Sequence, residues 1–407
     1  MPDHKNFSVG RRNLLLKGTG AIAATTLLGA CGGSGSGAEA PRLAVSMGAT
    51  RAAAAVAASK GATINVKSCG QAGATASCVV RTFKINASPV DPAATQAAKD
   101  MYTWLISKFG KFIISGQTDQ NKFDYVKSLT GHYPLLRGFD MQHYSPAYSW
   151  LWDNNAINPS TGQPGYFTIG PDLAEPSIDN SIAWYTTNGK KPLISYQWHW
   201  HSPSGGTAGT NTFYTDSTTF DASRAVTAGT QEYADTLRDI DAIAVQLKKL
   251  RDAGVPIIWR PLHEAGGTWF WWSAKGPAVY QALWNMMYDR LVNYHGLHNL
   301  LWAWCGDDAA WYPGNDKVDI VGIDSYPGNF VYINNKVEFD KVYTISSGQK
   351  LIAMTENGPT PDIETSLSGG APWSFFMSWY DVTQGNDDAH LVAVYSDPRV
   401  MTLERYS

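Results

Sequence analysis

The run Pro256-Ile-Ile-Trp-Arg-Pro-Leu-His-Glu264 is an apolar segment of strand-like length that ends in a histidine and a glutamate. A second apolar run, Leu351-Ile-Ala-Met-Thr-Glu-Asn-Gly358, carries Glu356 near its end. Short apolar runs between polar segments are typical of parallel strands that are buried on both faces. The sequence therefore predicts a carboxylate at the end of each of two buried strands.

Runs of this kind recur along the chain, and helical patterns lie between some of them. Glu232–Ala253 and Pro277–His295 have the apolar spacing of amphipathic helices. This rhythm predicts an α/β fold, a (β/α)8 TIM barrel. The alternative is a doubly wound open sheet, which would carry a glycine-rich phosphate turn after an early strand, and the sequence shows none. The expected strands are Lys111–Thr118, Tyr133–Asp140, Lys191–Trp200, Pro256–Glu264, Asn299–Gly306, Val318–Tyr326, Leu351–Gly358 and Asp388–Asp397.

In such a barrel the two glutamates follow the fourth and seventh strands, whose ends lie across the central axis from one another. Two carboxyl groups about 5–5.5 Å apart would support a retaining glycosidase, with one acid/base and one nucleophile. Arg260 shares a strand face with position 264 and can orient a carboxylate. A zincin would need a second histidine at position 267, where the chain has glycine.

Aromatic residues are abundant, with 16 tryptophans and 20 tyrosines. They fit either a large aromatic core or a carbohydrate cleft, because flat rings pack against the C–H faces of sugars. Trp269-Phe-Trp-Trp272 is predicted to form a floor for sugar rings. The insertion Met141–Lys190 follows the second strand, and its aromatic residues either wall a substrate groove or form a self-packed surface loop. These residues are Tyr144, Tyr148, Trp150, Trp152 and Trp184.

The N-terminal region has the pattern of an export signal. Arg11-Arg-Asn-Leu-Leu-Leu-Lys17 resembles a twin-arginine signal, and Leu28-Gly-Ala-Cys31 resembles a bacterial lipobox. We expect residues 1–30 to be a signal peptide and residues 31–62 to be a flexible linker, anchored to the membrane through lipidated Cys31. The protein would then be a cell-envelope lipoprotein on the periplasmic face or the cell surface. An ordinary cleaved signal peptide is the alternative.

Residues 63–90 alternate sufficiently to predict a small β-hairpin extension, and residues 91–407 form the expected barrel. Cys69 and Cys78 are close enough in sequence to close a small loop as a disulfide, which leaves Cys305 as a buried thiol. The formal net charge of -3 and the lack of a long basic run give no indication of a nucleic-acid partner.

Several of these segments together resemble glycoside hydrolase family 26, a β-mannanase family among the clan A barrels, over about residues 90 to 400. The stretch from Arg260 to Trp272 is the most specific. The matching segments fall in order on the expected strands two, three, four, six and seven: Gly138-Phe-Asp-Met-Gln-His143, Trp198-His199, Arg260-Pro-Leu-His-Glu-Ala-Gly-Gly-Thr-Trp-Phe-Trp-Trp272, Val321-Gly-Ile-Asp-Ser-Tyr326 and Thr355-Glu-Asn-Gly358.

The resemblance implies a retaining endo-β-1,4-mannanase that hydrolyses mannan, glucomannan or galactomannan as a monomer, without a metal or organic cofactor. Alternatives are a relative that acts on β-xylan or mixed-linkage β-glucan, and a non-catalytic carbohydrate-binding barrel. A pure binding protein would gain little from two buried carboxylates. The implied roles are Glu264 as acid/base, Glu356 as nucleophile, Tyr326 as hydrogen-bond donor to the nucleophile, and His263, Trp269, Trp198 and His143 as contacts to the sugar.

Overall fold

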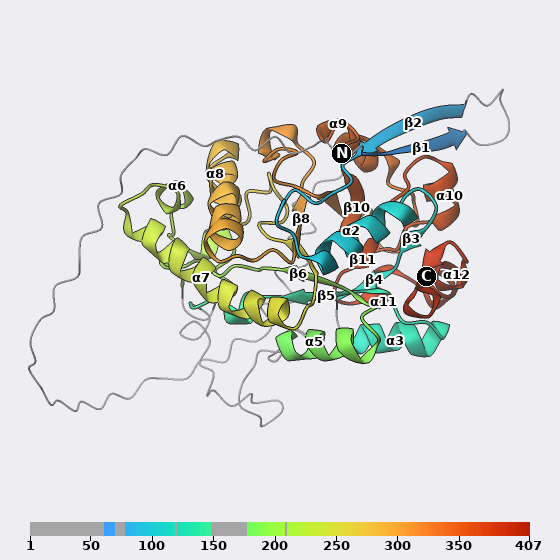
Figure 1. Cartoon of the computed structure of the whole chain (residues 1–407), viewed down its shortest axis with the longest axis horizontal. Coiled ribbons are helices and arrows are strands. Elements are labelled where there is room, and N and C mark those ends of the chain that lie inside the picture. Colours follow the sequence, from blue (N-terminus) through green and yellow to red (C-terminus); the bar gives the residue numbers. More distant parts are fainter. Residues whose placement is uncertain (1–60, 70–77, 119, 148–176, 208–209) are drawn as a thin grey trace, which may run out of the picture. The chain divides into compact units, whose positions relative to one another are not determined.

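The computed structural model describes residues 61–69, 78–118, 120–147, 177–207 and 210–407, and among these parallel strands close into a barrel (Figure 1). Each strand pairs with the next one along the chain, and the last pairs with the first. This is the predicted (β/α)8 TIM barrel. Its strands are β4 (Gly116–Gln117), β5 (Leu136–Asp140), β6 (Leu193–Gln197), β7 (Ile257–Arg260), β8 (Leu300–Cys305), β9 (Ile320–Ser325), β10 (Leu351–Asn357) and β11 (Phe376–Ser378).

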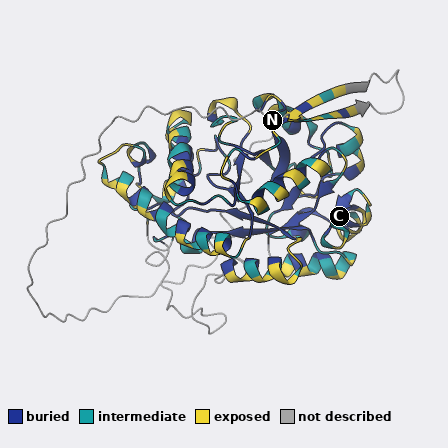
Figure 2. Ribbon diagram, viewed as in Figure 1, coloured by how far each residue is buried: buried dark blue, intermediate teal, exposed yellow. Residues whose placement is uncertain are grey.

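The barrel strands are buried on both faces, as their apolar composition predicts (Figure 2). Trp259, Trp302 and Trp304 have no exposed surface. They lie on one side of the neighbouring strands β7 and β8, because Trp259 pairs with Trp302 and Trp304 is two residues further along its strand. Helices and short irregular segments cover the outside of the barrel. The helices are α2 (Gln96–Lys108), α3 (Gln120–Thr130), α5 (Ser177–Thr187), α6 (Ala222–Ala225), α7 (Gln231–Asp252), α8 (Pro277–Tyr288), α9 (Lys336–Ile345), α10 (Ile363–Ser368), α11 (Val382–Gly385) and α12 (Asp388–Ser396).

The long helix α7 shows why these sequences form helices at these places. Thr230 caps its start by accepting a hydrogen bond from the backbone N–H of Tyr233 at 3.2 Å. Its buried side chains recur every three or four residues, as at Ile240, Ile243 and Leu247. Gly254, with a φ of 72°, ends it in the left-handed conformation. The helix predicted over 232–253 is therefore confirmed.

The last predicted strand is wrong, because Asp388–Asp397 is helical. Asp387 caps α12 by accepting a hydrogen bond from the backbone N–H of His390 at 2.8 Å. Leu391, Val394 and Tyr395 are buried at helical spacing. The eighth barrel strand is instead β11, which has three residues and is too short to show a periodic pattern.

The first predicted strand, Lys111–Thr118, is divided into two short parts. Its second part, β4, belongs to the barrel, whereas β3 (Ile113–Ile114) pairs outside it with β12 (Val400–Met401). Backbone pairing between β12 and β3 therefore holds the C-terminal part of the chain next to the start of the barrel.

The N-terminal extension is the predicted antiparallel hairpin of β1 (Ala62–Cys69) and β2 (Cys78–Ile85). Phe83 anchors it, fully buried, with its ring edge-on to Phe109 at 4.9 Å and to Tyr343 at 5.0 Å. The register places Cys69 opposite Cys78. Backbone positions paired in this way are close enough for a disulfide, and the bridge stays a prediction.

Across the part of the chain that the structure describes, none of the helices combines the length and apolar character needed to span a membrane. The predicted signal peptide and nearly all of the predicted linker lie outside the described residues.

Candidate active site

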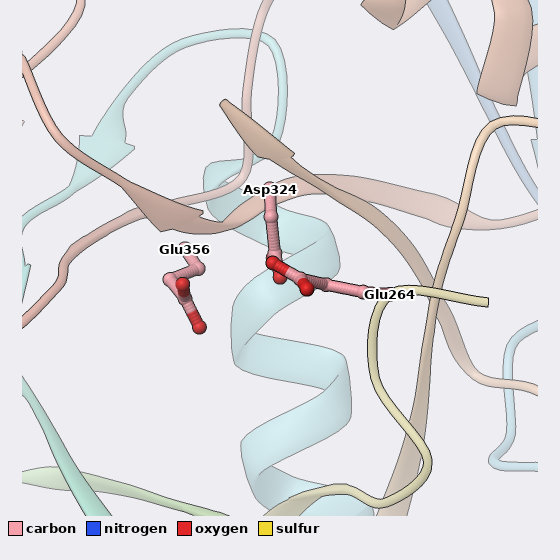
Figure 3. A group of neighbouring side chains, drawn as sticks. All are labelled: Glu264, Asp324 and Glu356. Carbon is pink, nitrogen blue, oxygen red and sulfur yellow. The ribbon is translucent and has the colours of Figure 1, made fainter. Parts of the chain in front are cut away.

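Three acidic side chains meet at the carboxyl-terminal end of the barrel. Glu264 follows β7, Asp324 lies on β9 and Glu356 lies on β10, and one oxygen from each lies within 4.8 Å of the others. Figure 3 shows the side chains of Glu264 and Asp324 directed toward each other, with Glu356 beside them. The structure thus brings together the two glutamates from the fourth and seventh strands, at the short separation that suits retaining glycoside hydrolysis.

Arg260, at the end of β7, binds two of these carboxylates through hydrogen bonds. Its guanidinium donates hydrogen bonds to Gln197, to Asp324 and, at 3.1 Å, to Oε2 of Glu356. Burial alone would lower the pKa of Arg260, but the charges of Asp324 and Glu356 raise it above its usual value. A permanent buried cation therefore compensates part of the negative charge at the site.

Glu356 is held at both of its oxygens. Oε1 accepts a hydrogen bond from the phenol of Tyr326, and Oε2 accepts from Arg260. The glutamate side chain is 1% exposed. Two donors, one of them charged, favour an ionised carboxylate in a fixed orientation, which is the state that a nucleophile needs.

Glu264 has a different environment. It is half-buried, and its Oε2 accepts a hydrogen bond from the indole Nε1 of Trp269 at 2.5 Å. Its backbone φ is 55° and that of Leu262 is 49°, both in the left-handed region that non-glycine residues rarely adopt. Conformations of this kind cluster at functional sites, and here they set the position of the carboxylate beyond the strand end.

Asp324 is the member of the cluster that the sequence reasoning did not single out. Thr355 donates a hydrogen bond to it at 3.1 Å, and Gly322 makes room for this threonine, since a Cβ at Gly322 would lie 2.3 Å from the Thr355 methyl group. Burial raises the pKa of Asp324; Arg260 opposes this, and the charges of Glu356 and Glu264 add to it. Asp324 lies two residues before Tyr326, on the same face of the strand, and this spacing is the feature of the sequence that could have identified it as a site residue.

A second polar network lies beside the cluster and involves His199. Its Nδ1 lies 2.5 Å from Oδ2 of Asp140. Burial would raise the pKa of Asp140, but His199 and a hydrogen bond from Gln197 lower it overall. Gln197 also receives the hydrogen bond from Arg260, so this network and the carboxylate cluster share a residue.

The residues predicted to contact the sugar differ in how far their side chains are exposed. Trp269 and His143 are half-buried and retain exposed surface. His263 and Trp198 are 0% and 1% exposed, so they offer almost no surface to a sugar in this structure. The ring of His263 packs edge-on against that of His199, with 4.6 Å between the ring centroids. This contact joins the segments that follow β6 and β7.

The aromatic floor predicted at residues 269–272 is wrong for three of its four members. Phe270, Trp271 and Trp272 are at most 1% exposed. Trp272 donates a hydrogen bond to the backbone carbonyl of His263 at 3.0 Å, and Trp271 donates to that of Trp200 at 2.7 Å. These rings fix the backbone around the strand end, and Trp269 alone of the four keeps substantial exposed surface.

The predicted groove wall between residues 141 and 190 is largely outside the described residues, which omit 148–176. Trp184 is described, and it does not line the site. It lies on α5, with its ring edge-on to Phe123 at 5.3 Å and to Tyr133 at 5.2 Å. Its role is therefore to pack helices against each other outside the barrel.

Comparisons with known proteins agree with this geometry. The sequence pattern of glycosyl hydrolase family 26 matches residues 90–405. A mannan endo-1,4-β-mannosidase from Thermothelomyces thermophilus is 37% identical over 332 residues, which cover 79% of this chain and 64% of that protein. A mannan endo-1,4-β-mannosidase B from Piromyces is 33% identical over 79% of this chain and 54% of its own length.

The fold is also similar to that of solved family 26 structures. A Podospora anserina GH26-CBM35 β-(1,4)-mannanase superposes with a TM-score of 0.72 at 34% identity, covering 81% of this chain and 71% of that one. The chain therefore spans about one half to two thirds of the length of the first curated relatives that it matches, and most of the solved Podospora chain.

Proposed function

The chain belongs to glycosyl hydrolase family 26, and from this premise we propose that it is a retaining endo-β-1,4-mannanase. The observation that carries the proposal is the pair Glu264 and Glu356, whose carboxyl oxygens lie within 4.8 Å and whose surroundings differ. The relatives named as mannan endo-1,4-β-mannosidases support mannan, glucomannan or galactomannan as the substrate class.

In the proposed mechanism Glu356 attacks the anomeric carbon and forms a covalent glycosyl-enzyme, while Glu264 gives its proton to the departing glycosidic oxygen. Tyr326 and Arg260 keep the attacking carboxylate ionised and oriented through their hydrogen bonds. Water then cleaves the glycosyl-enzyme bond, and Glu264 takes a proton from that water. Two inversions give net retention of configuration, with no step that calls for a metal or an organic cofactor.

The remaining residues divide between contact with the sugar and support of the site. We assign contact to Trp269, which is half-buried next to Glu264, and to His143. His263 and Trp198 support the site from behind, because they are buried. Both glutamates come from one chain, so the proposed active unit is a monomer, and size-exclusion chromatography with activity assays on the eluted fractions tests this.

Two alanine variants test the mechanism directly. Glu356→Ala should abolish turnover. Glu264→Ala should keep activity on aryl glycosides with good leaving groups, and added azide should increase that activity and yield a glycosyl azide of retained configuration. An inverted product, or full activity on polysaccharide in either variant, would overturn the assignment of these residues.

The substrate is tested by product profiling on linear mannan, galactomannan, xylan and lichenan. Release of oligosaccharides from the mannans alone supports the proposal. Preferential cleavage of xylan or lichenan would instead favour the alternative substrates, β-xylan and mixed-linkage β-glucan. Binding of mannan without any release of reducing ends would favour a non-catalytic carbohydrate-binding barrel.

For the location of the protein, we propose export and lipid anchoring at Cys31 in the cell envelope. The Leu28-Gly-Ala-Cys31 sequence and the Gly/Ser-rich segment that follows it support this proposal. Cells that express the full chain should incorporate a labelled lipid precursor into it, and a Cys31→Ala variant should not be labelled. An unlabelled mature wild-type protein in the same experiment would end the proposal.

A further inference from the structure

The segment Pro327–Asn335 between β9 and α9, which we name the rim loop, exposes several apolar side chains. Phe330 is 55% exposed, Val331 39% and Ile333 45%. The segment contains no charged residue. Exposed apolar side chains that lie next to each other on a protein surface commonly mark a binding site.

The rim loop is fixed in place by the rest of the protein. The backbone N–H of Phe330 donates a hydrogen bond to the carbonyl of Gly385 at 2.9 Å. The phenol of Tyr332 donates to Asp387 at 2.9 Å, and its ring stacks on His390 with 3.5 Å between ring centroids. Phe330 has a φ of 62°, an unfavourable conformation for a bulky residue. The fold thus holds an aromatic side chain outward despite a local conformational cost.

The rim loop is continuous with the catalytic cluster. It begins directly after Tyr326, whose phenol donates a hydrogen bond to Glu356. Gly385, which holds Phe330, packs against Gly358, since a Cβ at Gly385 would lie 2.9 Å from the Gly358 carbonyl carbon. Gly358 is two residues beyond Glu356. The exposed ring therefore belongs to the catalytic end of the barrel, on the side of the nucleophile.

We propose that Phe330 is an aromatic platform for a sugar residue of the polysaccharide chain, away from the bond that is cleaved. This inference rests on the proposed function, because it requires a polymeric substrate. An aromatic face packs well against the C–H face of a sugar ring, and an uncharged loop suits a neutral polymer. A membrane-binding loop would instead be expected to carry Lys or Arg, and this loop carries neither.

The test compares wild type with Phe330→Ala on linear manno-oligosaccharides of increasing length and on soluble mannan. On the longest substrates kcat/KM should fall roughly tenfold, as expected for the loss of one aromatic contact. The loss should appear mainly in KM, because the contact exists equally in the ground state and the transition state. On the shortest substrate that the enzyme cleaves, kcat/KM should be unchanged.

Two further variants exclude a purely structural effect. Phe330→Trp keeps a flat ring and should retain the wild-type dependence on chain length. Tyr294→Ala removes another exposed aromatic side chain, 67% exposed, from the helical segment after α8, and should have no effect on that dependence. Thermal unfolding of each variant shows whether the fold is intact.

Failure of this inference is distinct from failure of the proposed function. If wild type cleaves mannan and the ratio of kcat/KM between long and short substrates is the same in Phe330→Ala, the platform is refuted while the mannanase assignment stands. If wild type releases nothing from mannan, the proposed function fails first. The length series then uses oligosaccharides of the polymer that it does cleave, and an equal ratio there refutes the platform as well.

Discussion

Replacing Tyr326 by Phe removes the hydrogen bond from its phenol to the proposed nucleophile while keeping the aromatic ring. The phenol donates to Oε1 of Glu356, and Arg260 continues to donate to Oε2. A hydrogen bond to a charged group contributes about 1.5–3 kcal/mol. If this contribution is lost from the reacting geometry, kcat/KM should fall roughly 10- to 150-fold, since each 1.36 kcal/mol corresponds to a factor of ten.

The assay is steady-state hydrolysis of mannan by Tyr326→Phe over a range of pH, together with thermal unfolding. The acidic limb of the kcat/KM profile should move to higher pH, because the phenol stabilises the ionised carboxylate. Tyr125→Phe is the matched control. It removes a phenol–carboxylate hydrogen bond to Asp388 on the outside of the barrel and should leave the rate unchanged. A wild-type rate in Tyr326→Phe, or an equal loss in the control, would refute the reasoning.

Three further predictions concern pH, the core and the buried cation. Burial lowers the pKa of His201 to about 3 and that of His143 to about 4. Unfolded histidine titrates near 6.5 and would bind a proton that the folded form rejects, so the free energy of unfolding should fall as pH falls below about 6.5, by up to about 1.4 kcal/mol per pH unit and histidine. Equal urea stability at pH 7 and 5 would contradict this. Phe83→Ala should lower the free energy of unfolding by about 3–5 kcal/mol while kcat stays the same; a loss of kcat in the folded variant would give the hairpin a role in the site. Arg260→Met should cost about 3–5 kcal/mol because it leaves buried carboxylates uncompensated, and Arg260→Lys should recover part of that stability with little activity; a fully active lysine variant would argue against the fork of hydrogen bonds.

The barrel and its two glutamates could be predicted because each depends on local sequence. Apolar runs mark buried strands, and a polar residue at the end of such a run lies at the catalytic face. Glu264 and Glu356 both have this signature. The prediction fails where the local pattern is short or ambiguous. β11 has only three residues, and the apolar residues of α12 also fit a strand, although Asp387 caps a helix there.

The partners of each carboxylate could not be predicted in the same way, because they come from different strands. Arg260 reaches both Asp324 and Glu356 only once β7, β9 and β10 are assembled in the barrel. The burial of Trp271 and Trp272 also depends on tertiary contacts, since a run of aromatic residues has the same sequence whether it lines a site or supports it from behind.

The charge at the site limits how many of its three carboxylates can be ionised together. Two like charges 4.8 Å apart repel by about 3–4 kcal/mol at an effective dielectric constant near 20, so one guanidinium beside three carboxylates favours retention of one proton. Arg260 and Tyr326 both donate to Glu356 and favour its ionised form, whereas burial raises the pKa of Asp324. In the proposed mechanism the proton leaves with the departing sugar as Glu356 loses its charge by forming the glycosyl bond. The number of negative charges facing Arg260 is then the same before and after this step, so the buried site needs no compensating change of charge during the reaction.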